Sequence, residues 1–188
     1  LRSVQSSEAL CFQAEAHSFE ELFMQFQYCP QCGRQLGQCP FGDDGQVPWC
    51  SHCHKPYFEI FPVVAITMVV DELGEVALLK QAYLSSDYYN FVSGYVKPGE
   101  TAEACALREV QEEIGITASS LHFMCSQWVE EQQMLLLGFI ARAEKTAFTL
   151  SGEVDEALWL PAAQALEKVY PAGNITHTML AQYLKAQK

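Results

Sequence analysis

GYVKPGETAEACALREVQEEIGI, residues 94–116, is the most informative segment of the sequence for the expected structure. It places Glu109, Glu112 and Glu113 close together beside Arg108. Carboxylates held this close raise one another's pKa and repel unless a cation neutralises them. The stretch therefore predicts a helix that carries a cation site.

The boundaries of this helix can be read from its flanking residues. Gly94, Pro98 and Gly99 are typical of a loop, and Thr101 is suited to cap the helix start. The helical pattern then runs from Ala102 until Gly115 can end it.

The helix is expected to have two different faces. At about 100° per residue, Leu107, Val110 and Ile114 form one apolar stripe, and the three glutamates cluster on roughly the opposite side. We expect Ala102 and Cys105, which are small, to leave room for a substrate on the acidic side.

The clustered oxygens predict Mg²⁺ or Mn²⁺ as the cation, because these hard ions prefer carboxylates, waters and phosphates as ligands. Such an ion would polarise a diphosphate. The competing interpretation is an ordinary solvated acidic face, which is what most acidic runs are. The complete spacing favours the metal site, since it combines the glutamates with Gly94, Glu100, Arg108 and Gly115 at fixed intervals.

Two CxxC pairs, Cys29 with Cys32 and Cys50 with Cys53, are separated by seventeen residues. This spacing is typical of a structural zinc ribbon. Four thiolates around Zn²⁺ leave no open coordination position, so the zinc is expected to stabilise the fold and to take no part in catalysis.

The spacing of these cysteines also permits other interpretations. The pairs could be unrelated, one of them a redox dithiol, and His52, His54 or Cys39 could replace a ligand.

The remaining pattern predicts a small amino-terminal region, 1–57, and a larger domain, 58–188. Residues 7–27 have the apolar spacing of a short amphipathic helix. The larger domain is expected to be α/β with a mixed sheet. Its expected strands are residues 58–70, 75–81, 121–129 and 134–144, the first two forming a hairpin, and its expected helices are 161–169 and 174–187, the latter capped by Asn174.

The chain has 11 basic and 23 acidic residues and a formal net charge of -12, which opposes attraction to nucleic acid or anionic lipid. Its longest apolar run, residues 60–70, is too short for a membrane helix. The first residues lack the pattern of a secretory signal, so a cytoplasmic location is expected by default.

With all defining positions of residues 94–116 in place, the chain resembles the Nudix hydrolases. The resemblance implies an α/β/α sandwich over roughly residues 58–188. A four-cysteine ribbon directly before such a domain is similar to the NADH pyrophosphatase branch, and the resemblance also favours a homodimer.

The resemblance also implies roles for individual residues. Glu109 and Glu113 would be ligands of Mg²⁺ or Mn²⁺, Glu112 a further ligand or the base that activates water, and the backbone near Ser93 and Gly94 would add a carbonyl. Arg108 and Glu100 would orient the glutamates. A later ligand is implied in GEVDEALW, where Glu153 is preferred to Glu156.

The expected reaction is metal-dependent hydrolysis of a pyrophosphate bond in a nucleotide conjugate, with an NADH-like dinucleotide favoured. Of the SQPWPFP signature of NADH pyrophosphatases, only Ser126, Gln127 and nearby Trp128 are kept in SQWVEEQQ. ADP-ribose, FAD and nucleotide sugars therefore stay as alternatives, as does a ligand-sensing binding module. The candidates to contact substrate are Tyr83, Phe91, Gln127 and Trp128.

Overall fold

The computed structural model describes residues 26–187. The chain divides into two compact units, Leu1–Glu59 and Ile60–Lys188. The helix expected over residues 7–27 falls almost wholly outside the described residues.

The described part of the first unit is a small antiparallel sheet. Its elements are β1 (Gly37–Pro40), the short helix η1 (Gly42–Asp44), β2 (Gln46–Cys50) and β3 (Lys55–Pro56), with strand order β1-β2-β3. Only Cys29, Val47 and Cys50 are fully buried among the described residues of this unit. So few apolar side chains cannot stabilise a fold without an additional constraint such as a metal.

The second unit is built on a six-stranded mixed sheet. Its main path runs β7-β8-β4-β5-β9, with β6 paired to β4. The parallel pair is β4 and β8, and the other pairs are antiparallel. The strands are β4 (Val63–Val70), β5 (Glu75–Lys80), β6 (Val92–Tyr95), β7 (Ser120–Val129), β8 (Met134–Arg142) and β9 (Glu156–Pro161).

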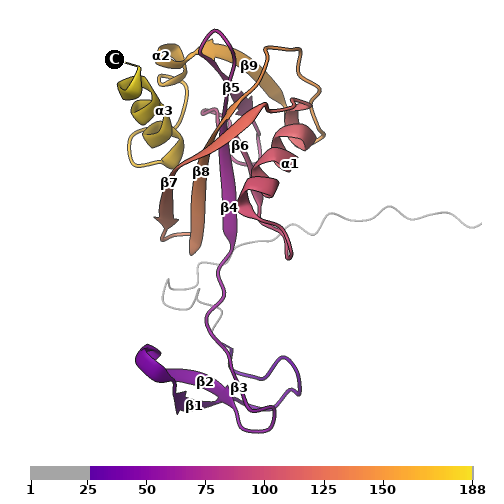
Figure 1. The fold of residues 1–188 in the computed structure, drawn as a ribbon, viewed down its shortest axis with the longest axis vertical. Coiled ribbons are helices and arrows are strands. Elements are labelled where there is room, and N and C mark those ends of the chain that lie inside the picture. Colours follow the sequence, from indigo (N-terminus) through magenta and orange to yellow (C-terminus); the bar gives the residue numbers. More distant parts are fainter. Residues whose placement is uncertain (1–25, 188) are drawn as a thin grey trace, which may run out of the picture. The chain divides into compact units, whose positions relative to one another are not determined.

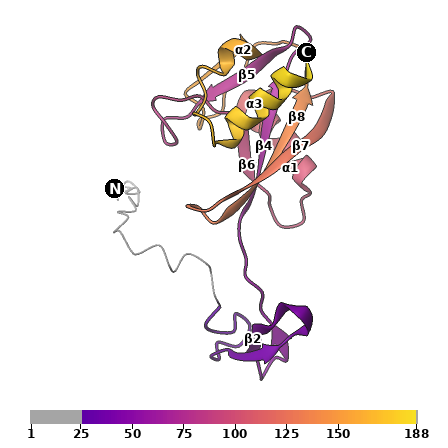
Figure 2. The ribbon, with the colours of Figure 1, turned by 90° about the vertical axis from the view of Figure 1, so that its left-hand side faces the viewer.

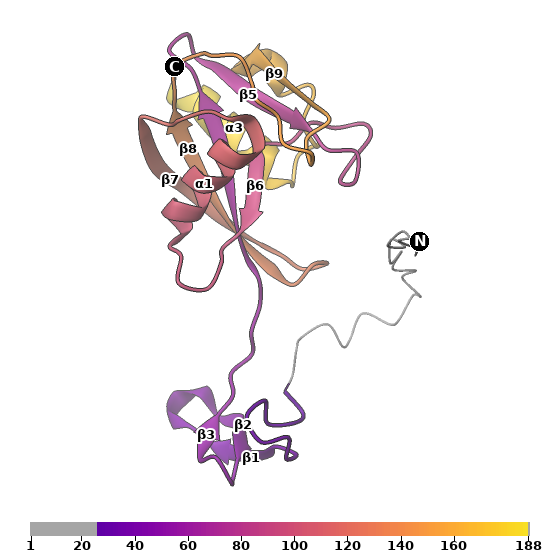
Figure 3. The same cartoon turned by 90° about the vertical axis from the view of Figure 1, so that its right-hand side faces the viewer.

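Helices cover both faces of this sheet, as the α/β/α sandwich requires. α1 (Ala102–Ile114) lies on one face, and α2 (Ala162–Ala165) and α3 (Ile175–Ala186) lie on the other. The two side views show α3 in front of the strands from one side and α1 in front of them from the other (Figures 2 and 3).

β4 contributes to the apolar core on each face of the sheet. All its residues after Val63 are buried, and successive side chains alternate between the two faces of the sheet. Ile66, Met68 and Val70 pack in the cluster that contains α3 residues, and Val69 packs in the cluster that contains α1 residues. The apolar run is thus explained by a central strand buried on both sides.

The strand expected over residues 58–70 is shorter than predicted. β4 begins only at Val63, and Ile60 and Phe61 are exposed. Pro62 has no amide hydrogen to donate, so it cannot extend the ladder as an ordinary residue would.

The caps of the helices agree with the predictions. The Thr101 hydroxyl accepts a hydrogen bond from the Ala104 amide at 3.2 Å, and the Asn174 side chain accepts one from the Thr176 amide at 2.9 Å. Gly115 ends α1 in the left-handed conformation, with φ of 70°. The helix expected over residues 161–169 is reduced to the four residues of α2.

Two strands were not expected. Gly94, predicted in a loop, lies in β6, which pairs with β4 and so adds to the sheet. β9 pairs with β5 along six residues. The predicted β4–β5 hairpin keeps only the register Val70↔Val76 around its turn, because β5 then turns toward β9 and β6 takes its place beside β4.

Candidate functional site

A cavity of about 800 Å³ lies in the second unit beside the carboxylate-bearing face of α1. Glu109, Glu112 and Glu113 line it from the helix, and Ser93 and Gly94 line it from β6. The other lining residues come from β4, the ends of β6 and β7, β8, the loops after β5, after β6, after β7 and before β9, and the start of α3. The cavity therefore gathers residues that are far apart in the sequence.

The place of Gly94 is fixed by the Glu109 carboxylate. A Cβ at residue 94 would overlap the Glu109 side chain, whose nearest atom is Oε1. Any side chain at residue 94 would push this carboxylate away from β6. The glycine is thus required for the close approach of α1 to the strand.

Arg108 connects three of the predicted glutamates. Its guanidinium donates to Glu100 at 2.7 Å, to Glu112 at 3.0 Å and to Glu109. The hydrogen bonds from Arg108 lower the pKa of Glu100 to about 2, with help from the Lys97 amide. Arg108 and Glu100 therefore hold the acidic side of α1 together and do not line the cavity.

Glu113 is the most deeply placed of these carboxylates. Its side chain is nearly fully buried, and Oε1 accepts a hydrogen bond from the Gln81 amide at 3.2 Å. Its other oxygen, Oε2, is buried without a hydrogen-bond partner among residues 26–187. Burial, followed by the charges of Glu109 and Glu153, raises the pKa of Glu113 to about 7.

The apolar face of α1 differs in part from the prediction. Val110 and Ile114 are fully buried, but Leu107 is 41 % exposed. Cys105 is fully buried, and its thiol donates to the backbone carbonyls of Gly94 and Tyr95. The expectation that Cys105 leaves room for substrate is therefore wrong, because its small side chain allows α1 to pack closely against β6.

Glu153 reaches the same cavity from the loop before β9. This loop docks on the end of α1, since the amides of Thr149 and Ser151 donate to the carbonyls of Ile114 and Glu113, each at 3.0 Å. The Ser151 hydroxyl in turn accepts from the Glu153 amide at 3.2 Å. The carbonyls of the last turn of α1, which have no partner within the helix, thus position the loop that carries the Glu153 carboxylate.

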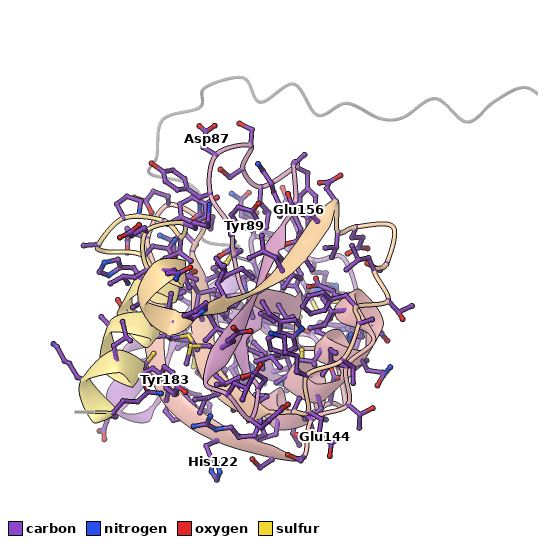
Figure 4. The ribbon with its side chains drawn as sticks, turned by 90° about the horizontal axis from the view of Figure 1, so that it is seen from above. Asp87, Tyr89, His122, Glu144, Glu156 and Tyr183 are labelled. Carbon is purple, nitrogen blue, oxygen red and sulfur yellow. The ribbon has the colours of Figure 1, made fainter. Side chains whose placement is uncertain are left out.

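Glu156, the alternative to Glu153, does not line the cavity. Figure 4 labels Glu156 and Tyr89, which lie near each other. Burial and a hydrogen bond with Glu156 raise the pKa of Tyr89. The two glutamates therefore have different surroundings, and Glu153 is the one beside α1.

The residues expected to contact substrate are divided by the structure. Tyr83 lines the cavity and is 67 % exposed. Phe91 is fully buried in the core that faces α3, so it offers no surface on which a base can stack. Trp128 packs edge-on against Phe61, and Gln127 donates to the Gly173 carbonyl at 2.9 Å; neither lines the cavity.

Sequence reasoning missed the polar residues at the α3 end of the cavity. Asn90, Asn174 and Thr176 line it, and the buried Thr176 hydroxyl donates to the Asn90 side chain at 2.8 Å. Lys97 also lines the cavity. The cap signal at Asn174 was visible in the sequence, but nothing there placed the start of α3 beside β4.

The cavity suits a hard divalent cation. The buried Glu113 Oε2 lacks a partner among the described residues, and Glu109, Glu112 and Glu153 add further oxygens to the same walls. No three of these oxygens lie within 4.8 Å of one another. Like-charge repulsion opposes a closer approach of these carboxylates, and Arg108 pairs with Glu109 and Glu112. A bound cation would offset the repulsion.

The four predicted zinc ligands converge in the first unit. Cys29, Cys32, Cys50 and Cys53 hold their sulfurs within 4.8 Å of one another, and this is the one such group of potential ligands in the described chain. The Cys29–Cys53 and Cys32–Cys50 sulfur distances are 3.8 and 3.6 Å. Zn–S bonds of about 2.3 Å in a tetrahedron require sulfurs about 3.8 Å apart, so the cluster fits zinc.

The pKa values of these thiols also favour a bound cation. Burial raises the pKa of Cys29, but hydrogen bonds, first from the Tyr57 hydroxyl at 3.0 Å, outweigh it and lower the value to about 6. Burial and the other cysteines raise the pKa of Cys53 to about 12. Four thiolates cannot coexist here without a cation.

The alternative zinc ligands are not part of this cluster. Cys39, His52 and His54 are absent from the group, although Cys39 lies on β1 of the same sheet.

Within residues 26–187, no helix is long and apolar enough to cross a membrane.

Comparison with curated proteins finds relatives at low identity. The NAD-capped RNA hydrolase NudC of Pseudomonas fluorescens is 27% identical over 165 residues, which cover 80% of this chain and 58% of that protein. The protein of the same name from Haemophilus influenzae is 29% identical over 168 residues, covering 86% and 61%. The chain thus spans about three fifths of the length of these relatives.

Solved structures share the fold. A NUDIX hydrolase from Nitrosomonas europaea superposes with a TM-score of 0.64 at 20% identity, covering 86% of this chain and 92% of that one. The NUDIX domain of Shewanella oneidensis NrtR, solved with ADP ribose, gives a TM-score of 0.60 at 13% identity, covering 70% and 91%. The family model of the NUDIX domain matches residues 60–181. The chain therefore belongs to the NUDIX domain family.

Proposed function

We propose that this protein is a metal-dependent pyrophosphohydrolase that cleaves the diphosphate linkage of a nucleotide conjugate. The observation that supports it most is the convergence of four glutamates on one cavity, including the buried and half-unpartnered Glu113. The favoured substrate is an NADH-like dinucleotide, which agrees with the name of the NudC relatives. A bound Mg²⁺ or Mn²⁺ would supply the positive charge that stabilises the phosphates and lowers the pKa of water.

The residues divide the work. Glu109, Glu113 and Glu153, with the carbonyl at Gly94, would hold the cation, and Glu112, the most exposed of the α1 set, would hold it or take a proton from water. Arg108 and Glu100 keep Glu109 and Glu112 in place. Lys97 is the single cationic side chain among the lining residues, so the chain itself offers little charge to a diphosphate.

The relatives' name widens the substrate range. An RNA capped with NAD presents the same diphosphate as free NAD, so the expectation that no nucleic acid binds does not extend to a capped 5′ end. The net charge of -12 still opposes an extended RNA footprint. We therefore expect any capped RNA to be recognised at its dinucleotide end.

The test offers purified protein with Mg²⁺ or Mn²⁺ a panel of NADH, NAD-capped RNA, ADP-ribose, FAD, nucleotide sugars and nucleoside triphosphates. We expect release of monophosphates from NADH and a loss of at least about 100-fold in Glu113→Gln, because losing a metal ligand costs more than losing a residue that only orients one, which costs about 10–100-fold. Glu103→Gln, the same substitution on an exposed position of α1, should keep full activity. Activity that persists in Glu113→Gln would exclude the proposed site, and turnover of no compound would favour a ligand-sensing module.

A further inference from the structure

A buried side-chain amide, that of Gln81, lies beside the carboxylates of α1. Gln81 follows the last residue of β5 and is only 2% exposed. Its Nε2 donates to Glu113 Oε1 at 3.2 Å. Gln81 does not line the cavity, so it touches the site through Glu113.

The backbone around Gln81 is fixed on both sides. Its carbonyl accepts from the amides of Leu84 and Ser85 at 2.9 and 3.1 Å. Asp155, two residues after Glu153, donates its amide to the Lys80 carbonyl at 2.9 Å and accepts from the Ala82 amide at 2.6 Å. The Gln81 side chain therefore starts from a point that the ends of β5 and of the Glu153 loop hold together.

Keeping an amide at this position carries a cost in stability. The Gln81 Oε1 is buried and has no hydrogen-bond partner among the residues that the structure describes, and the same is true of Glu113 Oε2. A buried unpaired polar atom costs about 1–3 kcal/mol, which an apolar side chain of equal length would avoid. The amide is therefore better explained by its contact with Glu113 than by packing.

A neutral donor suits this contact. An arginine or lysine here would pair with Glu113 and compete with a cation for its charge, as Arg108 does with Glu109 and Glu112. The amide of Gln81 occupies one carboxylate oxygen and leaves the charge of the group in place.

We propose that Gln81 is a positioning residue, which fixes the Glu113 carboxylate through Oε1 so that Oε2 stays available to the cation. This inference rests on the metal site proposed above. Partners of this kind hold a ligand's orientation, and their loss costs about 10–100-fold in metal affinity.

The test measures Mn²⁺ binding without substrate, from the electron paramagnetic resonance signal of the unbound ion. We expect Gln81→Met, which keeps the length of the side chain, to weaken Mn²⁺ affinity about 10–100-fold while the thermal transition is kept. Gln111→Met is the matched control, because Gln111 is exposed on α1 and, among the described residues, its side chain hydrogen-bonds only to Thr117. Wild-type Mn²⁺ affinity in Gln81→Met would overturn the inference.

A double-mutant cycle shows whether Gln81 acts through Glu113. In the Glu113→Gln background, Gln81→Met should cause no further loss of Mn²⁺ affinity, and fully additive losses would contradict the proposal. If Glu113→Gln alone binds Mn²⁺ normally, the proposed metal site fails first. Should Gln81→Met not fold, Gln81→Asn, which retains an amide too short to reach Glu113, carries the same expectation.

Discussion

Burial governs the behaviour of Glu113 more strongly than its charged neighbours do. The enclosed position removes water from the carboxylate, and Glu109 and Glu153 add repulsion, so that the pKa rises to about 7. A native state with a raised carboxyl pKa binds the proton more tightly than the unfolded chain does. Stability must therefore fall as the pH rises from about 4.5, where the unfolded group titrates, to about 7.

The fall in stability with rising pH gives a prediction for the protein without added Mg²⁺ or Mn²⁺. Glu113→Gln has no carboxylate to deprotonate, so its free energy of unfolding relative to wild type should increase between pH 4.5 and 8, by up to about 3 kcal/mol. Urea unfolding across this range measures the difference. Added Mg²⁺ should abolish the pH-dependent part, whereas a difference that is constant with pH would show that Glu113 is not perturbed.

Gly94 allows a second prediction about a single residue. Gly94→Ala places a Cβ against the Glu109 carboxylate, so we expect hydrolysis to fall at least about 10-fold with weaker Mn²⁺ binding. Gly152→Ala is the control, since a Cβ there meets no atom of residues 26–187 within 4 Å. Equal rates for both variants and wild type would mean that the position of Glu109 is not set by β6.

Candidate site residues could be predicted from the sequence where they form a regular local pattern. Glu109, Glu112 and Glu113 could be found because they follow one another on one helix. Gln81 could not, since its partner is 32 positions away and a single glutamine after a strand carries no pattern. Phe91 was mistaken for a contact residue because cores and pockets use the same aromatic side chains.

The carboxyl end of α1 is the element that joins the site together. Its last turn offers carbonyls to Thr149 and Ser151, and its cap residue, Gly115, faces Thr149 directly. A Cβ on Gly115 would lie 2.7 Å from the Thr149 Cβ. The glycine thus serves both the left-handed cap and the docking of the loop that carries Glu153.

Two alanine variants separate these effects. Gly99 has a left-handed backbone, and a Cβ added there would meet no atom of the described residues within 4 Å. We therefore expect Gly99→Ala to lower the free energy of unfolding by about 1–2 kcal/mol, from the backbone conformation alone. Gly115→Ala adds the overlap with Thr149, which should cost a further 1–3 kcal/mol or so and weaken Mn²⁺ binding through Glu153. Chemical denaturation compares the two, and equal losses would show that the loop does not depend on Gly115.

Elements with a local signal were predicted well, and those that depend on distant partners were not. The helix 102–114 and its caps follow from Thr101, Gly115 and the apolar period. β6 has only four residues, and it is a strand because β4 offers it an edge. β9 likewise depends on pairing with β5, which no local pattern reveals.

The two units of the molecule are stabilised by different interactions. The second unit has three clusters of buried apolar side chains, whereas the described part of the first has a four-sulfur cluster and few buried residues. The first should therefore depend on zinc for its fold, and the second should not.

Zinc removal tests this difference. We expect one Zn²⁺ per chain by metal analysis, lost in Cys50→Ala and kept in Cys39→Ala, whose sulfur lies outside the cluster. In Cys50→Ala, the amide resonances of residues 26–59 should collapse toward unfolded positions while those of 60–187 remain dispersed. Unfolding of both units together in this variant would show that the second has no stability of its own.

We propose that Glu109, Glu112 and Glu113 of α1, together with Glu153, hold a hard divalent cation in the cavity. Crystals soaked in Mn²⁺ and measured for anomalous scattering test it most directly. We expect a peak between Glu109 and Glu113, at the Glu113 Oε2 that has no hydrogen-bond partner among residues 26–187, and we expect this peak to disappear in Glu113→Gln. An active enzyme whose soaked crystals show no anomalous density there, with these carboxylates turned to solvent, would contradict it.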